Sequence, residues 1–492
     1  MRRNLAFLIT AIVALMVLSG CSFRPQIPTT NTQFRADIKD INLSKNWWED
    51  FGDERLNLAI ENALKNNSDL ALALNNIEIA RVNLGLSRLE FAPNLSASGG
   101  ATRANNLPKA PNLNDDSSYQ AGLNLSFELD LWGRIRNAVR AKRASYEASI
   151  YDAQIARLSV ATNTAIAYFT LAFFEEQRQI LADSVATYER TLALRAKQLK
   201  AGEVDALTYD QANSALILAK SQLLSAQDSY EKAQTALHLL CGSGYDQILH
   251  TKFVAHKLAK IPELPSGVPS TYLLMRPDVA LAAQNLLASN ALVGSARANY
   301  FPQISLTSSG GYASMDFDRL MISSASTWSL AGSFAMPLID FGRTKSAVEI
   351  ANLNQNASFI AYDKALKNAF ADVANALNSR KFALEKARNL DELLSNAHSQ
   401  FNLAQKRFSA GYASHLDFLD AQRNLLSAKL SKSSGDLEIA KALIGVYSAF
   451  GGGFRVGENG EILGVKGGDI QNLLDARKFH TPTKSASPFA DL

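Results

Sequence analysis

The sequence has little charge and no obvious membrane helices. Only 20% of its 492 residues are charged, and 50 basic against 46 acidic side chains leave a net charge of +4, which argues against nucleic acid as a partner. After the first twenty residues we find no apolar stretch long enough to span a bilayer as a helix, which excludes a polytopic helical membrane protein. A membrane β-barrel remains compatible, because alternating faces give it a weak hydropathy signal.

Groups that carry chemistry are also scarce. The six histidines lack the spacing and the acidic or cysteine neighbours that metal ligands show. No phosphate-binding loop is present, so ATP is not expected to be a substrate. The sequence therefore predicts no enzyme, no metal site and no cofactor other than a covalent lipid.

That lipid is predicted from residues 1–20, which have the pattern of a lipoprotein signal peptide. A short basic start precedes an uncharged apolar run that is too short for a spanning helix. The run ends in Leu18-Ser19-Gly20-Cys21, which resembles a bacterial lipobox and implies cleavage before Cys21, lipid attachment there and, with Ser22 next, the outer membrane as destination. The alternative is an uncleaved anchor with a chance cysteine. Cys241 is expected to fill a small space in the core.

The chain is an internal duplication. Glycine, proline, aspartate and arginine positions recur at a constant offset, as in Asp69 and Asp278, where 278 minus 69 is 209. Residues 60–242 and 269–451 are therefore copies of one unit. An N-terminal segment (21–59), a linker (243–268) and a polar, glycine-rich tail (452–492), expected to be irregular, lie outside them. Further matching pairs are Pro93 with Pro302, Gly133 with Gly342, and Gly202 with Gly411.

Each copy begins with a helix and continues with two strands. Residues 119–131 alternate apolar and polar side chains, the period of a strand with one apolar face. The length suits a tilted membrane strand of about 9–11 residues. We predict β-hairpins at 94–131 and 303–338. A half-buried sheet in a soluble domain has the same pattern, so the strands alone do not decide between lipid and a protein core.

Long helices follow the hairpins. No proline or glycine occurs between Gly133 and Ala201, or from Arg343 to Ala410, and good helix formers dominate both stretches. A continuous helix of this length measures roughly 100 Å. A glycine then ends each long helix. The return helices that follow are rich in alanine, which allows helices to pack closely side by side. A soluble coiled coil has the same features but leaves the amphipathic hairpins unexplained. The predicted ranges are 133–200 and 343–410 for the long helices and 205–240 and 414–449 for the return helices.

These parts predict a membrane β-barrel continued by a long α-helical barrel. Four strands cannot close a barrel, and an open sheet edge in lipid leaves backbone groups without partners. Closure therefore needs several chains, and a trimer supplies twelve strands and twelve long-helix segments around a lumen. Such an assembly is a conduit.

The sequence resembles the outer-membrane efflux proteins of the TolC type, in particular their OprM-like lipoprotein branch. The resemblance rests on motifs at 47–53 (WWEDFGD), 276–279 (RPDV), 294–302, 419–423 (LDAQR) and 451–454, where Phe454 replaces the usual tryptophan. It implies a homotrimer in outer-membrane lipid that ducts drugs and toxic small molecules. It also implies a periplasmic adaptor and an inner-membrane pump, usually of the resistance–nodulation–division class. A type I protein-secretion duct, or a non-pore spacer or adhesin, are the alternatives.

The resemblance also assigns roles near the helix reversals. Asp417 and Asp420 match acidic residues that line the periplasmic aperture in this family, with Thr208 and Asp210 as weaker candidates from the first copy. An ordinary solvated helix start is the alternative for the two aspartates. The arginine that can brace the closed gate is replaced here by Ala413. The turns that carry Gly202, Leu207, Gly411 and Leu416 are expected to dock the adaptor, and His415 to be exposed at a tip.

A basic cluster follows the first hairpin. Lipid headgroups could bind it, but a solvated helix face is the favoured interpretation. Its members are Arg134, Arg136, Arg140, Lys142 and Arg143.

Overall fold

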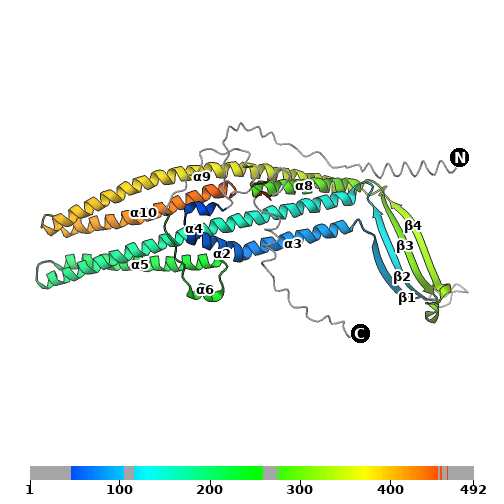
Figure 1. Cartoon of the computed structure of the whole chain (residues 1–492), viewed down its shortest axis with the longest axis horizontal. Helices are drawn as coiled ribbons and strands as arrows, with labels where there is room; N and C mark the ends of the chain where they lie inside the picture. The colour runs from blue at the N-terminus through cyan, green and yellow to red at the C-terminus, as the bar shows by residue number, and fades with distance from the viewer. Residues whose placement is uncertain are drawn as a thin grey trace. The chain divides into compact units, whose positions relative to one another are not determined.

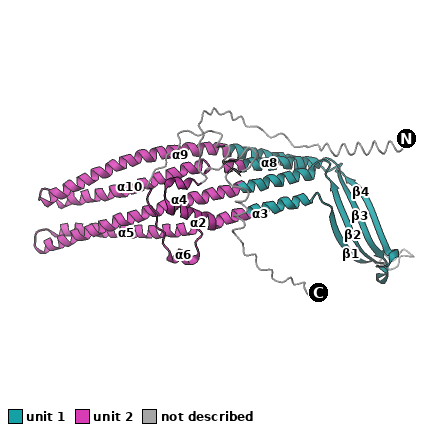
Figure 2. Cartoon of the chain, viewed as in Figure 1, with its two compact units in different colours: residues 1–32, 76–150, 281–364 teal, residues 33–75, 151–280, 365–492 magenta. Residues whose placement is uncertain are grey.

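The computed structural model describes residues 46–104, 116–258, 273, 276–452, 455–456 and 462–463. The signal peptide, Cys21 and most of the C-terminal tail therefore lie outside the described residues. The chain forms two compact units (Figure 2). Unit 1 contains the described parts of residues 76–150 and 281–364, and unit 2 contains those of 33–75, 151–280 and 365–492.

Unit 1 holds a four-stranded antiparallel sheet in the order β1-β2-β3-β4 (Figure 1). The two hairpins share one register: Ser98 pairs with Gly122 in the first, and their counterparts Thr307 and Ala331 pair in the second. Large apolar side chains on one face, such as Leu123, are exposed. The strands are β1 (Asn94–Ala104), β2 (Asp116–Leu129), β3 (Gln303–Ser314) and β4 (Ser326–Ala335).

Two strands end earlier than the alternation predicts. β2 ends at Leu129, not at 131, because the Asp130 carboxylate accepts hydrogen bonds from the backbone N–H groups of Ile135 (2.9 Å) and Arg136 (2.8 Å). Asp340 accepts in the same way from the next helix start, and β4 ends at Ala335 rather than 338. In both copies an acidic side chain caps the start of the long helix, and in the first copy it does so where the residue pattern still indicates strand.

The helices agree with the duplication. The two long helices are equal in length at 67 residues, and the two return helices at 35. Their bounds are α4 (Arg134–Lys200), α5 (Ala206–Leu240), α9 (Arg343–Ser409) and α10 (His415–Ala449). The helices before the hairpins are α2 (Glu54–Asn66), α3 (Ser68–Leu89) and α8 (Pro277–Ala298). Asn67 separates α2 from α3, because its side chain accepts from the N–H groups of Asp69 and Leu70.

Helix α8 corrects one expectation from the sequence. It is long and apolar enough to cross a membrane, although we found no such stretch after residue 20. One side of it packs against other helices of unit 1: fully buried Asn290 accepts from Gln355 at 3.1 Å, and the Ser295 hydroxyl donates to the Arg134 carbonyl at 3.1 Å. The apolar residues on that side, such as Leu286 and Val293, are buried and serve packing.

In unit 2, alanines bring α5 close to its neighbours. Five buried alanines recur at spacings of three, four and seven residues, the period of a coiled-coil seam. They are Ala212, Ala215, Ala219, Ala226 and Ala233. Leu419 of α10 joins Tyr188 of α4 in the same cluster as two of these alanines, so the first and second helical hairpins share a core.

The tryptophan-rich motif at 47–53 packs into unit 2. Trp47 stacks on Tyr447 with ring centroids 5.3 Å apart, and the Tyr447 hydroxyl donates to Asp50 at 2.7 Å. The Tyr168 hydroxyl donates to Asp53, also at 2.7 Å. The motif thus holds the N-terminal segment against α4 and α10. This packing explains why its aromatic and acidic residues stand at these positions.

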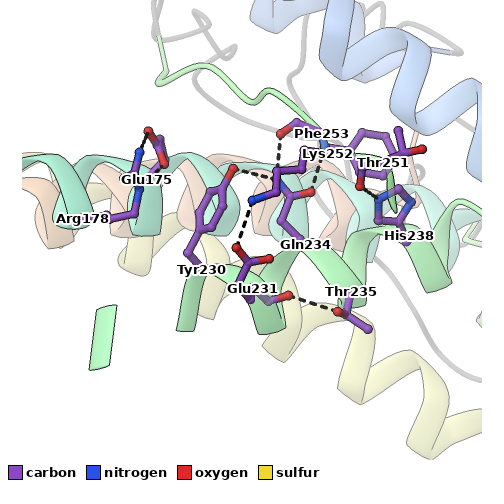
Figure 3. Close-up of polar contacts among 10 residues, drawn as sticks. All are labelled: Glu175, Arg178, Tyr230, Glu231, Gln234, Thr235, His238, Thr251, Lys252 and Phe253. Atoms are coloured by element: carbon purple, nitrogen blue, oxygen red, sulfur yellow. Dashed lines mark hydrogen bonds and ion pairs between the residues drawn. The ribbon is translucent and has the colours of Figure 1, made fainter. Parts of the chain in front are cut away.

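The linker between the copies lies on α5. After the short helix α6 (Tyr245–His250), the Gln234 side chain both donates to the Phe253 carbonyl and accepts from its N–H, each at 2.8 Å (Figure 3). His238 contacts the Thr251 carbonyl, and Lys252 pairs with Glu231 at 3.1 Å. Cys241, at the end of α5, is buried and its thiol donates to the Ala59 carbonyl, as expected of a core residue.

The tail was expected to be irregular, yet its described residues form two short strands, β5 (Arg455–Val456) and β6 (Ile462–Leu463), which pair antiparallel. Backbone pairing needs no apolar side chains, which is why composition did not indicate it.

Candidate functional site: the helical hairpin turns

The candidate site consists of the two turns that reverse the long helices of unit 2. Each ends in a glycine with left-handed backbone, Gly202 at φ 74° and Gly411 at φ 77°. The N–H of Glu203 bonds back to Gln198 at 2.9 Å, and that of Tyr412 bonds back to Arg407 at 2.8 Å. These are Schellman turns, which glycine favours because it has no Cβ to clash.

Side-chain caps start both return helices. Asp205 accepts from the N–H and the hydroxyl of Thr208, at 2.9 and 2.6 Å. Ser414 and Asp417 form a reciprocal capping box, with the Asp417 carboxylate accepting from the Ser414 N–H (3.0 Å) and hydroxyl (2.8 Å). These hydrogen bonds, above all those from the side chains of Thr208 and Ser414, hold the pKa of the Asp205 and Asp417 carboxyls below its ordinary value. Both carboxyls are therefore anions at neutral pH.

The other predicted site residues are exposed at these turns. Leu207 and Leu416 lie in the first turns of α5 and α10 with at least half of their surface accessible. Asp210 is exposed, and Asp420 makes only a long contact of 3.5 Å to Arg423. The contacts that the structure describes for Thr208, Asp417 and Asp420 are all local, each with a residue three positions away in the sequence.

The structure adds a contact that the sequence interpretation missed. Arg195 of α4 is buried, and its Nη2 donates to Nδ1 of His415 on α10 at 2.9 Å, while its guanidinium lies 4.9 Å from the centre of the Phe408 ring on α9. In the described part of the chain Arg195 makes no ion pair, and its Nε has no hydrogen-bond partner. This contact joins the two helical hairpins just behind their turns.

His415 is consequently half-buried, and the expectation that it is exposed at a tip is wrong. Since arginine can only donate, His415 accepts at Nδ1 and carries its proton on Nε2. Burial, and then the charge of Arg195, lower the pKa of His415 from 6.5 to about 4. The duplication contained a clue: the counterparts of Arg195 and His415 are Ala404 and Ala206, so both polar groups occur in only one copy.

The basic cluster after the first hairpin is largely paired. Arg134 makes two hydrogen bonds to Glu128, at 2.9 and 2.8 Å, and Arg136 contacts Asp130 at 3.2 Å. Arg143 contacts Glu147 at 3.2 Å. These pairs favour the interpretation as a solvated helix face.

Among the residues described, no group of three histidine, cysteine or acidic side chains is placed to hold a metal ion.

Comparison with known proteins now identifies the fold. The profile of the family described as "Outer membrane efflux protein" matches residues 59–243 and again 268–452, the two copies of the duplication. The chain belongs to this family. Among relatives, the "Cation efflux system protein CusC" of Escherichia coli K12 is 31% identical over 450 residues, covering 89% of this chain and 97% of the relative.

Further matches agree. The "Solvent efflux pump outer membrane protein SrpC" of Pseudomonas putida is 31% identical over 462 residues, 91% of this chain and 98% of the relative. The crystal structure of the Campylobacter jejuni CmeC outer membrane channel superposes with a TM-score of 0.83 at 29% identity, covering 93% of this chain and 98% of that one. The resemblance read from the motifs is confirmed: this outer-membrane efflux protein is a channel of the outer membrane that extends into the periplasm, and not an enzyme.

Proposed function

We propose that three copies of this chain close into one duct, which receives small toxic molecules from a periplasmic adaptor and an inner-membrane pump and releases them outside the cell. The observation that carries the trimer is the four-stranded sheet, whose edge strands β1 and β4 have no further partner strand among the described residues. A lipid-facing edge without partners is not tolerated in a bilayer. Three copies give twelve strands in the barrel and twelve long-helix segments in the tunnel.

The mass of the purified protein in detergent tests this. Three protein chains per particle are expected. A stable monomer that still inserts into vesicles would contradict the closed duct and support a non-pore spacer.

The gate is proposed to lie at the turns of unit 2. Threefold symmetry repeats the carboxylates of Asp417 and Asp420 around one axis, where they favour cations and disfavour anions. Asp417 also caps α10, so Asp420, exposed and only loosely contacted by Arg423, is the cleaner probe. Thr208 and Asp210 contribute from the first hairpin.

The gate experiment measures reversal potential and block by a trivalent cation in planar bilayers. Asp420→Ala is expected to lower cation preference and to weaken block from the periplasmic side, because each substitution removes three charges from a trimer. Asp152→Ala, at an exposed position of α4, is the matched control. Equal selectivity and equal block in all three proteins would place Asp420 outside the pore.

The turns themselves are proposed to dock the adaptor through Leu207 and Leu416, which are exposed although apolar. Replacing either with aspartate is expected to weaken adaptor binding while the particle mass is unchanged. Normal adaptor binding by both variants would refute docking at these turns.

Lipid attachment at Cys21 is proposed from the sequence pattern. Cys21→Ser is expected to abolish labelling by radioactive palmitate, and labelling that persists would refute the lipobox interpretation.

A further inference from the structure

The loop that joins β3 to β4, residues 315–325, carries large apolar side chains that are exposed. It lies at the end of the sheet away from the helices (Figure 1). Two 3₁₀ turns shape it, and only its Leu320 and Ala325 are buried among the apolar residues. The loop's own fold therefore leaves an apolar surface uncovered, and such surfaces mark interaction sites. The exposed side chains are Met315 (70%), Phe317 (71%), Met321 (69%) and Ile322 (45%).

The duplication shows that a loop at this position does not need such side chains. By the offset of 209, the corresponding loop of the first copy begins at residue 106, as in 315 minus 209. That loop is polar and rich in proline where the second loop is apolar. The positions of Met315, Phe317 and Met321 are occupied in the first copy by Asn106, Pro108 and Asn112. The apolar surface is therefore a property of the second hairpin alone.

A ring contact fixes the side of the sheet on which this loop lies. The Phe317 ring packs edge-on against the Tyr119 ring of β2, with centroids 5.4 Å apart. Since alternate residues of a strand share a face, Tyr119 lies on the same face as Leu123 and Leu125. That apolar face is the one that meets lipid in an outer-membrane barrel. Phe317 therefore lies on the lipid side of the sheet and not on the side of the lumen.

The same end of this face carries further aromatic side chains. Gly310 of β3 pairs with Leu123 on one side and with Trp328 on the other, so all three residues share the apolar face. Tyr312, two residues from Gly310 on the same strand, shares it as well. Trp328 is 84% exposed. Tyrosine and tryptophan gather where a membrane meets water, so Tyr119, Tyr312 and Trp328 mark that boundary.

The length of β2 agrees with this boundary. Tyr119 and Leu129 are ten steps apart, as in 129 minus 119. At about 3.4 Å per step and a tilt of about 40°, ten steps cover about 25 Å, the height of the apolar band of an outer-membrane barrel. The long helix α4 follows Leu129, and the channel extends into the periplasm, so Leu129 marks the periplasmic boundary. Tyr119 then marks the outer one, and Phe317 lies beside it.

We propose that the loop inserts Met315, Phe317, Met321 and Ile322 into the outer leaflet of the membrane, at the boundary between headgroups and acyl chains. The partner is the lipid surface itself, which continues the lipid-facing side of the sheet. The inference goes beyond the proposed duct and does not depend on how many copies form it. A loop held on the lipid side fixes the outer rim of the sheet at a set depth and leaves the mouth of the lumen uncovered by its own residues.

The charges of the loop show that this insertion is apolar and not electrostatic. The loop contains Asp316, Asp318 and Arg319, and two acidic residues against one basic residue leave it with a net charge of −1. Arg319 contacts Asp316 at 3.8 Å. Anionic headgroups do not attract such a loop, so burial of its apolar side chains has to supply the binding. Insertion should therefore occur equally well in a membrane without anionic lipid.

Fluorescence quenching in vesicles tests the insertion in the full-length protein, in a background with Cys241→Ser. Met321→Cys carries a bimane fluorophore in vesicles of phosphatidylcholine. A nitroxide on the lipid quenches from the membrane, and iodide quenches from water. Leu330→Cys, on the lipid face of β4, is the control for lipid. Gln120→Cys, next to Tyr119 but on the opposite face of β2, is the control for water. The protein without an introduced cysteine gives the background label.

We expect the ratio of lipid to iodide quenching for Met321→Cys to match that of Leu330→Cys and to exceed that of Gln120→Cys at least about fivefold. The ratio should not change when anionic phosphatidylglycerol is added. A ratio equal to that of Gln120→Cys would place the loop in water and overturn the proposal. Protection from both quenchers would overturn it in favour of a covering protein, and lipid quenching that requires phosphatidylglycerol would overturn it in favour of headgroup binding by Arg319.

A second variant tests the aromatic contact. Phe317→Ser, added to the labelled Met321→Cys protein, is expected to lower the quenching ratio at least about twofold, because the loop loses its largest apolar side chain. An unchanged ratio would refute the anchoring role of Phe317. Equal ratios for Leu330→Cys and Gln120→Cys would refute the orientation of the sheet on which the proposal rests. The particle mass is measured separately, so a failure of the proposed trimer is distinguished from a failure of the insertion.

Discussion

Acidification is predicted to loosen the contact between the two helical hairpins at His415. The neutral imidazole accepts a hydrogen bond from Arg195 at 2.9 Å, and a proton on Nδ1 would remove that bond and place two cations side by side. The folded pKa, about 4, lies below the ordinary value of 6.5. The stabilisation is therefore complete above pH 6.5 and is lost as the pH falls toward 4.

The magnitude follows from the two pKa values. Between pH 7.5 and pH 5, the linkage relation gives a loss of about 2 kcal/mol per chain for local opening, equivalent to about 30-fold. Asp417 and Asp205, whose pKa values are lowered, stay ionised over this range and do not compete.

Hydrogen–deuterium exchange of peptides covering residues 190–200 and 405–420 measures this opening. After correction for the intrinsic pH dependence, exchange at pH 5 is expected to be about 30-fold faster relative to pH 7.5. His415→Gln keeps an acceptor for Arg195 but cannot titrate, so its corrected exchange should not change with pH. The reasoning is refuted if the parent protein and the glutamine variant respond alike.

Two further predictions concern stability. Gly411→Val, at φ 77°, is expected to strain its turn by about 1–2 kcal/mol and to speed hydrogen–deuterium exchange there. The control Gly244→Val, at an ordinary φ of −65°, should not change the exchange rate. Equal effects of the two substitutions would mean that the left-handed turn is not the cause. Arg276→Leu removes the donor to the Ala449 carbonyl at 2.7 Å and is expected to lower the free energy of unfolding by about 1–3 kcal/mol. Arg423→Ala, at an exposed position, is expected to lower it by about 0.5 kcal/mol or less. Similar melting temperatures of the two variants would contradict a structural role for Arg276.

Most of the helices and strands could be predicted from the residue types along the sequence. Glycine at 202 and 411 ends the long helices because those positions need left-handed backbone, and this requirement is visible in the residue itself. The end of β2 was misplaced by two residues because Asp130 fits the strand alternation but caps the next helix, where its carboxylate accepts from the Ile135 N–H. A pattern cannot show which of two local roles a side chain takes.

The candidate site was harder to predict, since it depends on contacts between distant segments. Arg195 and His415 are 220 residues apart, and nothing near either residue indicates that they meet. The capping role of Asp417 was visible as an alternative, because serine three residues before an acidic residue is a capping box. Which acidic residues face a pore depends on the other copies and on no feature of a single chain.

Conductance of the purified protein in planar bilayers, measured together with its mass, tests the central claim most directly. A closed duct predicts discrete, cation-preferring current steps from a particle of three chains. A folded three-chain particle that inserts but carries no current, even after Asp420→Ala, would contradict the account.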